Sequence, residues 1–167
     1  MIVSTPTGHF FVCGASEGPT RLNARDGALL QARVGDCNLI RLGFILPPEC
    51  RLVDPHPLPA GALVPAAWAA ITSEMSGEVI SAAVAIAYPR DPSRPGVIME
   101  YSARGHKEDA EGIVRRMAEE GLKMRGLEIG DIRSLAVQHR VEQIGSAFAG
   151  VVLWDGEMLK KMSVRSE

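Results

Sequence analysis

Residues 107–125 carry the clearest pattern of apolar and polar positions in the chain, and this pattern predicts an amphipathic helix. The apolar residues recur at spacings of three and four, which places them on one stripe of a helix. They are Ala110, Ile113, Val114, Met117, Ala118 and Leu122. The positions between them are mostly charged, so we expect the apolar stripe to cover the face of a sheet.

A second helix is expected over residues 22–33, closed by Gly35, because glycine is favoured just past the end of a helix. Strands are predicted at residues 10–13, 37–46, 63–72, 79–87, 97–102, 132–140 and 147–154, with loops at 14–20, 51–60 and 89–95. Pro47 and Pro48 stop the second strand, since proline donates no hydrogen bond to a ladder. Strands outnumber helices and rarely alternate with them, which favours a layered α+β fold over a doubly wound parallel sheet.

The bulk composition fits one globular domain and excludes several classes of partner. Of the 167 residues, 46% are apolar and 23% are charged; we expect one domain at residues 1–157 and a polar tail at 158–167. The net charge of -2, without a stripe of Lys and Arg, argues against a nucleic-acid partner. The N-terminus is not a signal peptide by pattern, and the apolar stretches at 63–71 and 79–87 are too short to cross a membrane as helices.

The cysteines and histidines bear on the cellular compartment of the protein and on whether it binds a metal. Cys13, Cys37 and Cys50 form no C-x-x-C motif and are odd in number, so we expect free thiols and a cytoplasmic protein. The four histidines are scattered, and none has ligand spacing to a cysteine, so no metal site is predicted.

Seven short motifs follow one another in order, and together they resemble the pyruvoyl-dependent arginine decarboxylase family. They are GASEG at 14–18, LNARDGALL at 22–30, NLIR at 38–41, ILPPE at 45–49, GALVP at 61–65, IMEY at 98–101, and AFA at 147–149 with LW at 153–154. The resemblance implies a four-layer αββα sandwich of the pyruvoyl-dependent arginine/histidine decarboxylase type. It also implies a homotrimer with active sites between subunits.

The resemblance further implies self-cleavage, in which a serine hydroxyl attacks the preceding carbonyl and the new N-terminus becomes a pyruvoyl group. The motif match places the cut between Gly43 and Phe44, where neither side chain is a nucleophile. The flanking thiols, Cys37 and Cys50, lie outside the matched position. The sequence therefore predicts a lost cleavage site and no pyruvoyl cofactor. A displaced cleavage at Cys50 is the alternative, although a small apolar or surface thiol is the favoured interpretation of that residue.

Asp26 is a candidate for binding a cationic substrate. On a helix it shares a face with Leu22, Leu29 and Leu30, and a carboxylate on an apolar face is costly to bury unless it meets a cation. The resemblance implies that the matching acid contacts the guanidinium of the substrate, with Leu29 and Leu30 beside it. The alternative is that Asp26 caps a helix beginning at Gly27.

Glu100 is the candidate acid. Alternation along a strand turns Val97, Met99 and Tyr101 to one face and Glu100 to the other, between apolar neighbours. Desolvation there would favour the protonated carboxyl and suit it to acid/base chemistry. The resemblance implies a proton donor, and the alternative is a structural ion pair or an edge-strand charge.

Asn38 and Phe44 complete the predicted site, and His139 is assigned to structure. The resemblance implies that Asn38 positions the carbonyl at the cut and the substrate; the alternative is an ordinary asparagine at a strand start or in a turn. The Phe44 ring either binds a guanidinium or ammonium by stacking or cation–π attraction, or fills the vacated pocket as core. Alternation places His139 with Val137 and Val141, which favours a satisfied histidine inside a strand.

These features predict a repurposed, cofactor-independent enzyme that performs elimination, isomerisation or cyclisation on a small cationic amine or guanidine. Decarboxylation needs an electron sink, which the lost cleavage site would remove. Two alternatives stay open: a non-catalytic protein that binds amines or co-assembles with an active paralogue, and a genuine arginine decarboxylase with displaced processing or an external carbonyl cofactor.

Overall fold

The computed structural model describes residues 5–156, so the predicted tail at 158–167 lies outside the described residues. The α+β class is confirmed: within the described part, two helices accompany two sheets. The elements are β1 (Gly8–Glu17), α1 (Arg21–Gln31), β2 (Asn38–Arg41), β3 (Ile45–Leu46), β4 (Arg51–Leu52), β5 (Leu63–Ser73), β6 (Val79–Pro89), β7 (Gly96–Arg104), α2 (Lys107–Met124), β8 (Ile129–Arg140) and β9 (Gly145–Trp154). Neither helix is long and apolar enough to span a bilayer.

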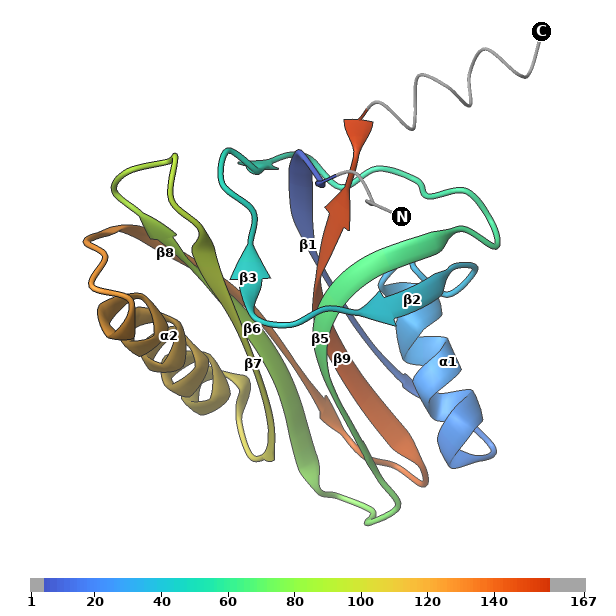
Figure 1. Cartoon of the computed structure of the whole chain (residues 1–167). Helices are drawn as coiled ribbons and strands as arrows, with labels where there is room; N and C mark the ends of the chain where they lie inside the picture. Colours follow the sequence, from blue (N-terminus) through green and yellow to red (C-terminus); the bar gives the residue numbers. More distant parts are fainter. Residues whose placement is uncertain (1–4, 157–167) are drawn as a thin grey trace, which may run out of the picture.

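The strands form a five-stranded sheet in the order β2-β5-β9-β1-β4 and a four-stranded sheet in the order β3-β7-β6-β8. The long strands pair antiparallel, and the short β2 and β4 join parallel to β5 and β1. Although β2 and β3 are consecutive, they belong to different sheets, and the chain between them crosses from one sheet to the other (Figure 1).

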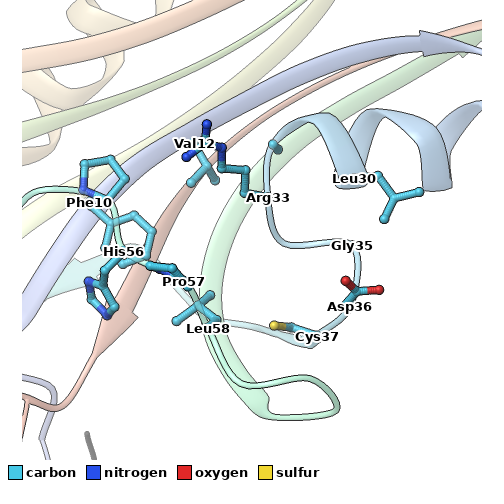
Figure 2. Close-up of a pocket in the computed structure, with 12 residues that line it drawn as sticks. Phe10, Val12, Leu30, Arg33, Gly35, Asp36, Cys37, His56, Pro57 and Leu58 are labelled. Atoms are coloured by element: carbon cyan, nitrogen blue, oxygen red, sulfur yellow. The ribbon is translucent and has the colours of Figure 1, made fainter.

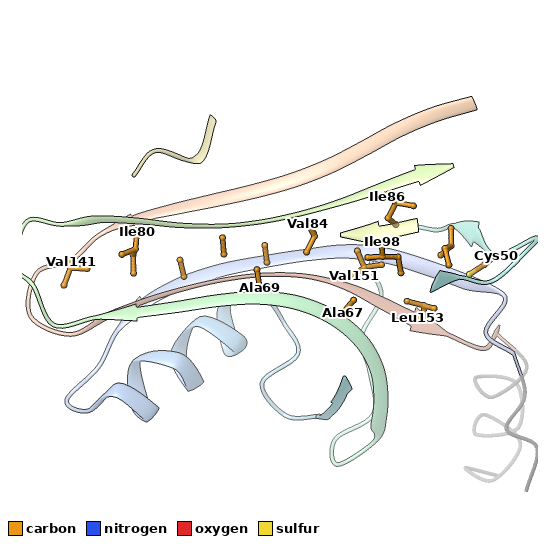
Figure 3. Close-up of a cluster of buried hydrophobic side chains, with 14 residues drawn as sticks. Cys50, Ala67, Ala69, Ile80, Val84, Ile86, Ile98, Val141, Val151 and Leu153 are labelled. Carbon is orange, nitrogen blue, oxygen red and sulfur yellow. The ribbon is translucent and has the colours of Figure 1, made fainter. Parts of the chain in front are cut away.

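Three clusters of buried side chains hold these elements together. One packs α1 on the five-stranded sheet, around Phe10, Ala28 and Phe148, and another packs α2 on the four-stranded sheet, around Val97 and Val114. The third contains side chains from both sheets, which face each other across it (Figure 3). The apolar stripe predicted for residues 107–125 is the stripe that contacts the sheet, because Ala110, Val114, Ala118 and Leu122 are all buried.

Three local predictions need correction. The strand predicted at 10–13 runs over Gly8–Glu17, because residues 14–17 continue the ladder with β9 where a loop was expected. The helix predicted at 22–33 covers Arg21–Gln31, and the Thr20 side chain caps it by accepting a hydrogen bond from the Asn23 N–H. The run at 37–46 is two short strands, β2 and β3, in different sheets.

Gly14 allows α1 to approach β1 closely, so we expect that a larger side chain at this position would lower the stability of the protein. A Cβ at Gly14 would collide with the carbonyl oxygen of Ala28 and lie 2.8 Å from the Ala32 nitrogen, both backbone atoms. Gly14→Ala should therefore lower the free energy of unfolding by about 1–3 kcal/mol, as overpacking does. In α2, a Cβ at Gly112 would approach only Arg116 Nη1, at 3.7 Å, so Gly112→Ala should raise it by up to about 1 kcal/mol. Urea denaturation checks both values; equal midpoints for the two variants would contradict the close packing.

His9 is a fully buried polar residue at one end of the core between the sheets, and it predicts a pH dependence of stability. Burial lowers the pKa of His9 from 6.5 to about 4. Between pH 6.5 and pH 4 the unfolded chain binds a proton at His9 that the folded chain excludes. The free energy of unfolding therefore has its full value above pH 6.5 and decreases as the pH falls below it. From pH 7.5 to pH 5 the loss is about 2 kcal/mol by linkage. His9→Gln should remove this part of the slope, whereas the exposed His106→Gln should keep it; parallel slopes for both variants in urea unfolding would refute the prediction.

Candidate active site

The crossing between β2 and β3, at residues 42–44, is fixed to both sheets. The Leu42 N–H donates to the Ala66 carbonyl at 2.9 Å, on the side of the five-stranded sheet. The Ile98 N–H donates to the Phe44 carbonyl at 2.7 Å, on the side of the four-stranded sheet. The segment where the motif match places a cut is therefore held by hydrogen bonds on each side.

An ion pair joins the two sheets immediately before this crossing. Arg41, the last residue of β2, places Nη1 2.5 Å from Glu100 Oε1 on β7, and the same nitrogen donates to the Trp68 carbonyl at 3.0 Å. The Arg41 guanidinium also lies over the Trp68 ring, 4.0 Å from its centroid. Because both charged side chains are partly exposed, the pair contributes at most about 1 kcal/mol to stability. Its clearer effect is to fix the position of the Glu100 carboxylate.

The predicted direction of Glu100 is confirmed, but its predicted desolvation is wrong. Ile98, on the same face of β7, lies in the cluster between the sheets, and Met99 and Tyr101 pack toward α2. The Glu100 side chain is 27% exposed and paired with Arg41, so it does not lie in an apolar, desolvated environment. In the single chain the ion-pair alternative holds, and the proton-donor role stays a prediction.

Gly43 and Phe44 are both exposed, and neither provides a hydroxyl or thiol. Phe44 is 56% exposed, so within one chain its ring does not fill a vacated pocket as core, and its binding of a cation stays a prediction. A Cβ at Gly43 would meet nothing within 4 Å. The crossing therefore does not fit the formation of a pyruvoyl group from residue 44, which requires a nucleophile on Cβ.

Asn38 begins β2, three residues before Arg41 and so about 10 Å away along the strand. Its Nδ2 donates to the Gly61 carbonyl at 3.3 Å, and its backbone N–H donates to the Ala62 carbonyl at 2.9 Å. The side chain is exposed at the edge of the sheet. This position matches the alternative of an asparagine at a strand start, and a catalytic role stays a prediction.

Asp26 lies in the middle of α1, on an exposed face. The alternative that it caps a helix at Gly27 is wrong, because α1 begins at Arg21. The prediction that its face is buried is also wrong within one chain: Leu22 is 80% exposed and Leu30 is 51% exposed, with only Leu29 packed against the core. Since α1 covers the five-stranded sheet and Glu100 belongs to the other, one chain does not bring Asp26 and Glu100 together (Figure 1).

A cavity of about 350 Å³ lies beyond the end of α1 (Figure 2). Leu30, Arg33 and Asp36 line one part of it, and residues 55–58 line another, in a stretch predicted only as an extended loop. His56 Nε2 is buried there without a hydrogen-bond partner. The cavity includes neither Arg41 nor Glu100, so the ion pair beside the crossing marks the candidate site better than the cavity does.

Glu17 and His139 form a separate structural contact. His139 Nε2 lies 2.6 Å from Glu17 Oε2, and the backbone N–H groups of Glu142 and Gln143 donate to the other carboxylate oxygen at 3.0 and 2.7 Å. Partial burial raises the pKa of the Glu17 carboxyl, but the hydrogen bonds from Gln143, His139 and Glu142 outweigh it, so the pKa lies below its usual value. The prediction of a satisfied histidine inside a strand is confirmed for His139.

Comparison with known proteins identifies what the chain is similar to. The family model described as "Pyruvoyl-dependent arginine decarboxylase (PvlArgDC)" matches residues 8–157. A protein of that name from Methanocaldococcus jannaschii is 52% identical over 143 residues, which are 86% of this chain and 87% of the relative. Proteins of the same name from Methanococcus aeolicus and Thermococcus kodakarensis are 48% and 36% identical over 86% and 90% of this chain, and over 87% and 96% of their own lengths.

These comparisons correct three predictions about chemistry. The expectation of no pyruvoyl cofactor is wrong, because the matched family and the relatives are pyruvoyl-dependent enzymes by description. The predicted cofactor-independent elimination, isomerisation or cyclisation is overturned by the same finding. The assignment to a lyase-like enzyme, isomerase or cyclase other than a standard pyruvoyl decarboxylase is also wrong. All three predictions depended on the single side chain at position 44.

Proposed function

This chain belongs to the pyruvoyl-dependent arginine decarboxylase family, and we propose that it is itself an arginine decarboxylase. The observation that supports this most strongly is 52% identity to the Methanocaldococcus jannaschii decarboxylase over 86% of the chain. In the reaction, arginine loses its carboxylate as CO₂ and gains a proton at Cα, which gives agmatine. Arginine is also a small guanidine, the class of substrate that the acidic residues predict.

Glu100 is the proposed proton donor to Cα. Its carboxylate is held at the junction of the two sheets by Arg41, which is itself fixed by the Trp68 carbonyl and ring. A fixed carboxyl group is a better acid catalyst than a mobile one, because the proton is delivered in one geometry. Arg41 is thus a positioning residue.

Asp26 is the proposed partner of the substrate guanidinium, together with Leu29, Leu30 and the exposed Phe44 ring, and Asn38 is the proposed positioning residue for the reacting carbonyl. Because Asp26 and Glu100 lie on different layers of one chain, we propose that a site combines Glu100 with Asp26 of the partner subunit. The exposed apolar residues support a homotrimer, since large exposed side chains mark contact surfaces. Leu22, Leu30, Ile40 and Leu63 are between 46% and 80% exposed.

Light scattering coupled to size exclusion tests the assembly. The unaltered chain should elute with the mass of three chains, and Leu63→Glu should shift it to smaller species, because a charge on a buried contact is costly. Met124→Glu is the matched control: Met124 is 78% exposed at the end of α2, away from the proposed contact, and should leave the trimer intact. A single-chain mass for the unaltered protein would refute the shared site.

The electron sink needs a separate origin, because residue 44 does not supply it. Loss of CO₂ leaves an electron pair on Cα, which a bound carbonyl group must delocalise. We propose that Gly43 and Phe44 are a lost cleavage site and that the carbonyl arises by displaced processing of the chain. The chain's own residues then bind and orient the substrate and deliver the proton.

Conversion of arginine, followed by chromatography of the amine product, tests the proposed function. The purified full chain should release agmatine from arginine, and phenylhydrazine, which captures carbonyl groups, should abolish the release. Ornithine serves as a matched substrate that lacks the guanidinium and should react far more slowly. Agmatine formation that persists in excess phenylhydrazine would contradict the carbonyl requirement, and no agmatine at all would contradict the function.

The proposal also includes the layered architecture of the chain and its location in the cytoplasm. The three clusters support a four-layer αββα sandwich within a single domain at residues 1–157, because each pair of adjacent layers has its own packed interface. Cys13, Cys37 and Cys50 are free thiols, which agrees with a cytoplasmic location.

A further inference from the structure

Three polar side chains meet at one end of the core between the sheets, away from the Arg41–Glu100 pair. His9 comes from β1, Tyr88 from the end of β6, and Cys50 from the turn that follows Pro47 and Pro48. His9 is fully buried, Cys50 is 7% exposed, and Tyr88 packs against the same cluster. Figure 3 shows Cys50 at the end of this cluster, beyond Leu153.

The three side chains form a continuous contact. Cys50 Sγ lies 3.6 Å from His9 Nδ1, and His9 Nε2 lies 2.7 Å from the Tyr88 hydroxyl. If the imidazole carries its proton on Nε2 and donates it to the Tyr88 oxygen, then Nδ1 is free to accept the thiol proton. A nucleophile, a base and a third group that orients the base are the arrangement that activates a thiol.

A second cavity, of about 290 Å³, opens beside this thiol. Its lining includes Cys50 and Tyr88 and three charged residues, Glu49, Arg51 and Arg94. The two guanidinium groups exceed the one carboxylate, so the lining favours a ligand that carries negative charge. The turn is fixed, because the Glu49 N–H donates to the Pro92 carbonyl at 3.1 Å and the Cys50 N–H donates to the Pro47 carbonyl at 3.2 Å.

We propose that Cys50 is a nucleophilic thiol that accepts an acyl group from a small anionic acyl compound in this cavity, with His9 as its base and Tyr88 orienting the imidazole. A bond forms between Sγ and the acyl carbon, and the bond from that carbon to the leaving oxygen breaks. The thiol proton passes to His9 Nδ1 and then to the leaving oxygen. Arg51 and Arg94 attract the negative charge of the acyl compound.

The resting state of the trio agrees with base-assisted attack. Burial raises the pKa of Cys50 to about 11 and lowers that of His9 to about 4, so both groups are neutral at rest. The proton therefore moves during the attack and not before it, as in hydroxyl nucleophiles with a histidine base. The inference does not rest on arginine decarboxylation, because the cavity contains neither Glu100 nor Arg41.

Acylation with two matched esters tests this site. The full chain is treated with the mono-4-nitrophenyl ester of glutaric acid, which is anionic, or with 4-nitrophenyl acetate, which is neutral; peptide mass spectrometry then locates the acyl group. With the anionic ester, we expect glutaryl transfer to Cys50 to exceed transfer to Cys37 by at least about tenfold. With the neutral ester, the preference of acetyl transfer for Cys50 over Cys37 should be smaller.

Variants separate a reactive site from a packed core. Cys50→Ala should abolish the burst of nitrophenolate, and Cys37→Ala should leave it unchanged. His9→Gln should slow acylation of Cys50 by at least about tenfold, and Tyr88→Phe, which keeps the ring, should slow it less. Far-ultraviolet circular dichroism checks that each variant is folded. Equal acylation of Cys50 and Cys37 in the unaltered chain, or no acyl group on Cys50, would overturn the proposal.

Discussion

Replacing Glu100 with glutamine is expected to lower kcat for arginine decarboxylation by about 10²–10⁴-fold, the usual contribution of a positioned acid. The amide has nearly the same shape as the carboxyl group and can still accept a hydrogen bond from Arg41, so the junction between the sheets is kept. It cannot deliver a proton to Cα. Agmatine release under saturating arginine measures the effect, and KM should change much less than kcat because the substrate contacts are retained.

Glu128→Gln is the matched control for this substitution. Glu128 also pairs with an arginine, Arg90, but both side chains are 76% exposed and lie outside the candidate site. The control should keep full activity. Loss of the same size in both variants, or full activity in Glu100→Gln with the fold intact, would show that Glu100 is not the proton donor.

Replacing Phe44 with serine is expected to cut the chain between residues 43 and 44, which gives a fragment that ends at Gly43 and a fragment that begins at residue 44. Serine places a hydroxyl on Cβ at the matched position, where it can attack the Gly43 carbonyl carbon. The crossing is already held by the hydrogen bonds of Leu42 and Phe44 to the two sheets, so the backbone on both sides of the new nucleophile is fixed. Because the Phe44 ring is 56% exposed, its removal should cost little stability. Intact mass spectrometry measures the division.

Phe44→Ala separates the hydroxyl from the loss of the ring. It truncates the side chain almost as far as serine does but carries no nucleophile, so it should stay in one piece at position 44. If the serine variant also stays whole over days, the crossing is not a competent cleavage site, and the match of Gly43 and Phe44 to the family's cut is wrong.

The sequence predicted the features that depend on local periodicity. The alternation Val97 to Tyr101 gave the correct direction of Glu100, because side chains on a strand point to opposite faces at every step. The apolar stripe in residues 107–125 gave the face of α2 that contacts the sheet. Both are decided within a few residues of chain.

The surroundings of Glu100 could not be predicted in this way. Arg41 is 59 positions earlier in the chain, and its contact requires β2 and β7 to be brought together in different sheets. Arg41 belongs to the NLIR motif at 38–41, and Trp68 was recognisable only as an aromatic residue in a predicted strand. Periodicity says which way a side chain points, but not what it meets, so the desolvation expected for Glu100 was wrong.

The exposed face of α1 shows a second limit. Leu22 and Leu30 share a face with Asp26, and an apolar face normally indicates a core, yet both are exposed in the single chain. The pattern cannot distinguish a face that packs inside the chain from one that packs against another copy. Identity to a relative over 143 residues is also stronger evidence about the activity than the side chain at position 44 alone.

Release of CO₂ from carboxyl-labelled arginine by the purified full chain is the measurement that decides whether the chain is an arginine decarboxylase. Labelled CO₂ should appear in a one-to-one ratio with agmatine and stop when the protein is treated beforehand with phenylhydrazine. A trimeric, correctly folded protein that releases no labelled CO₂ above a heat-treated sample would contradict the assignment as an arginine decarboxylase.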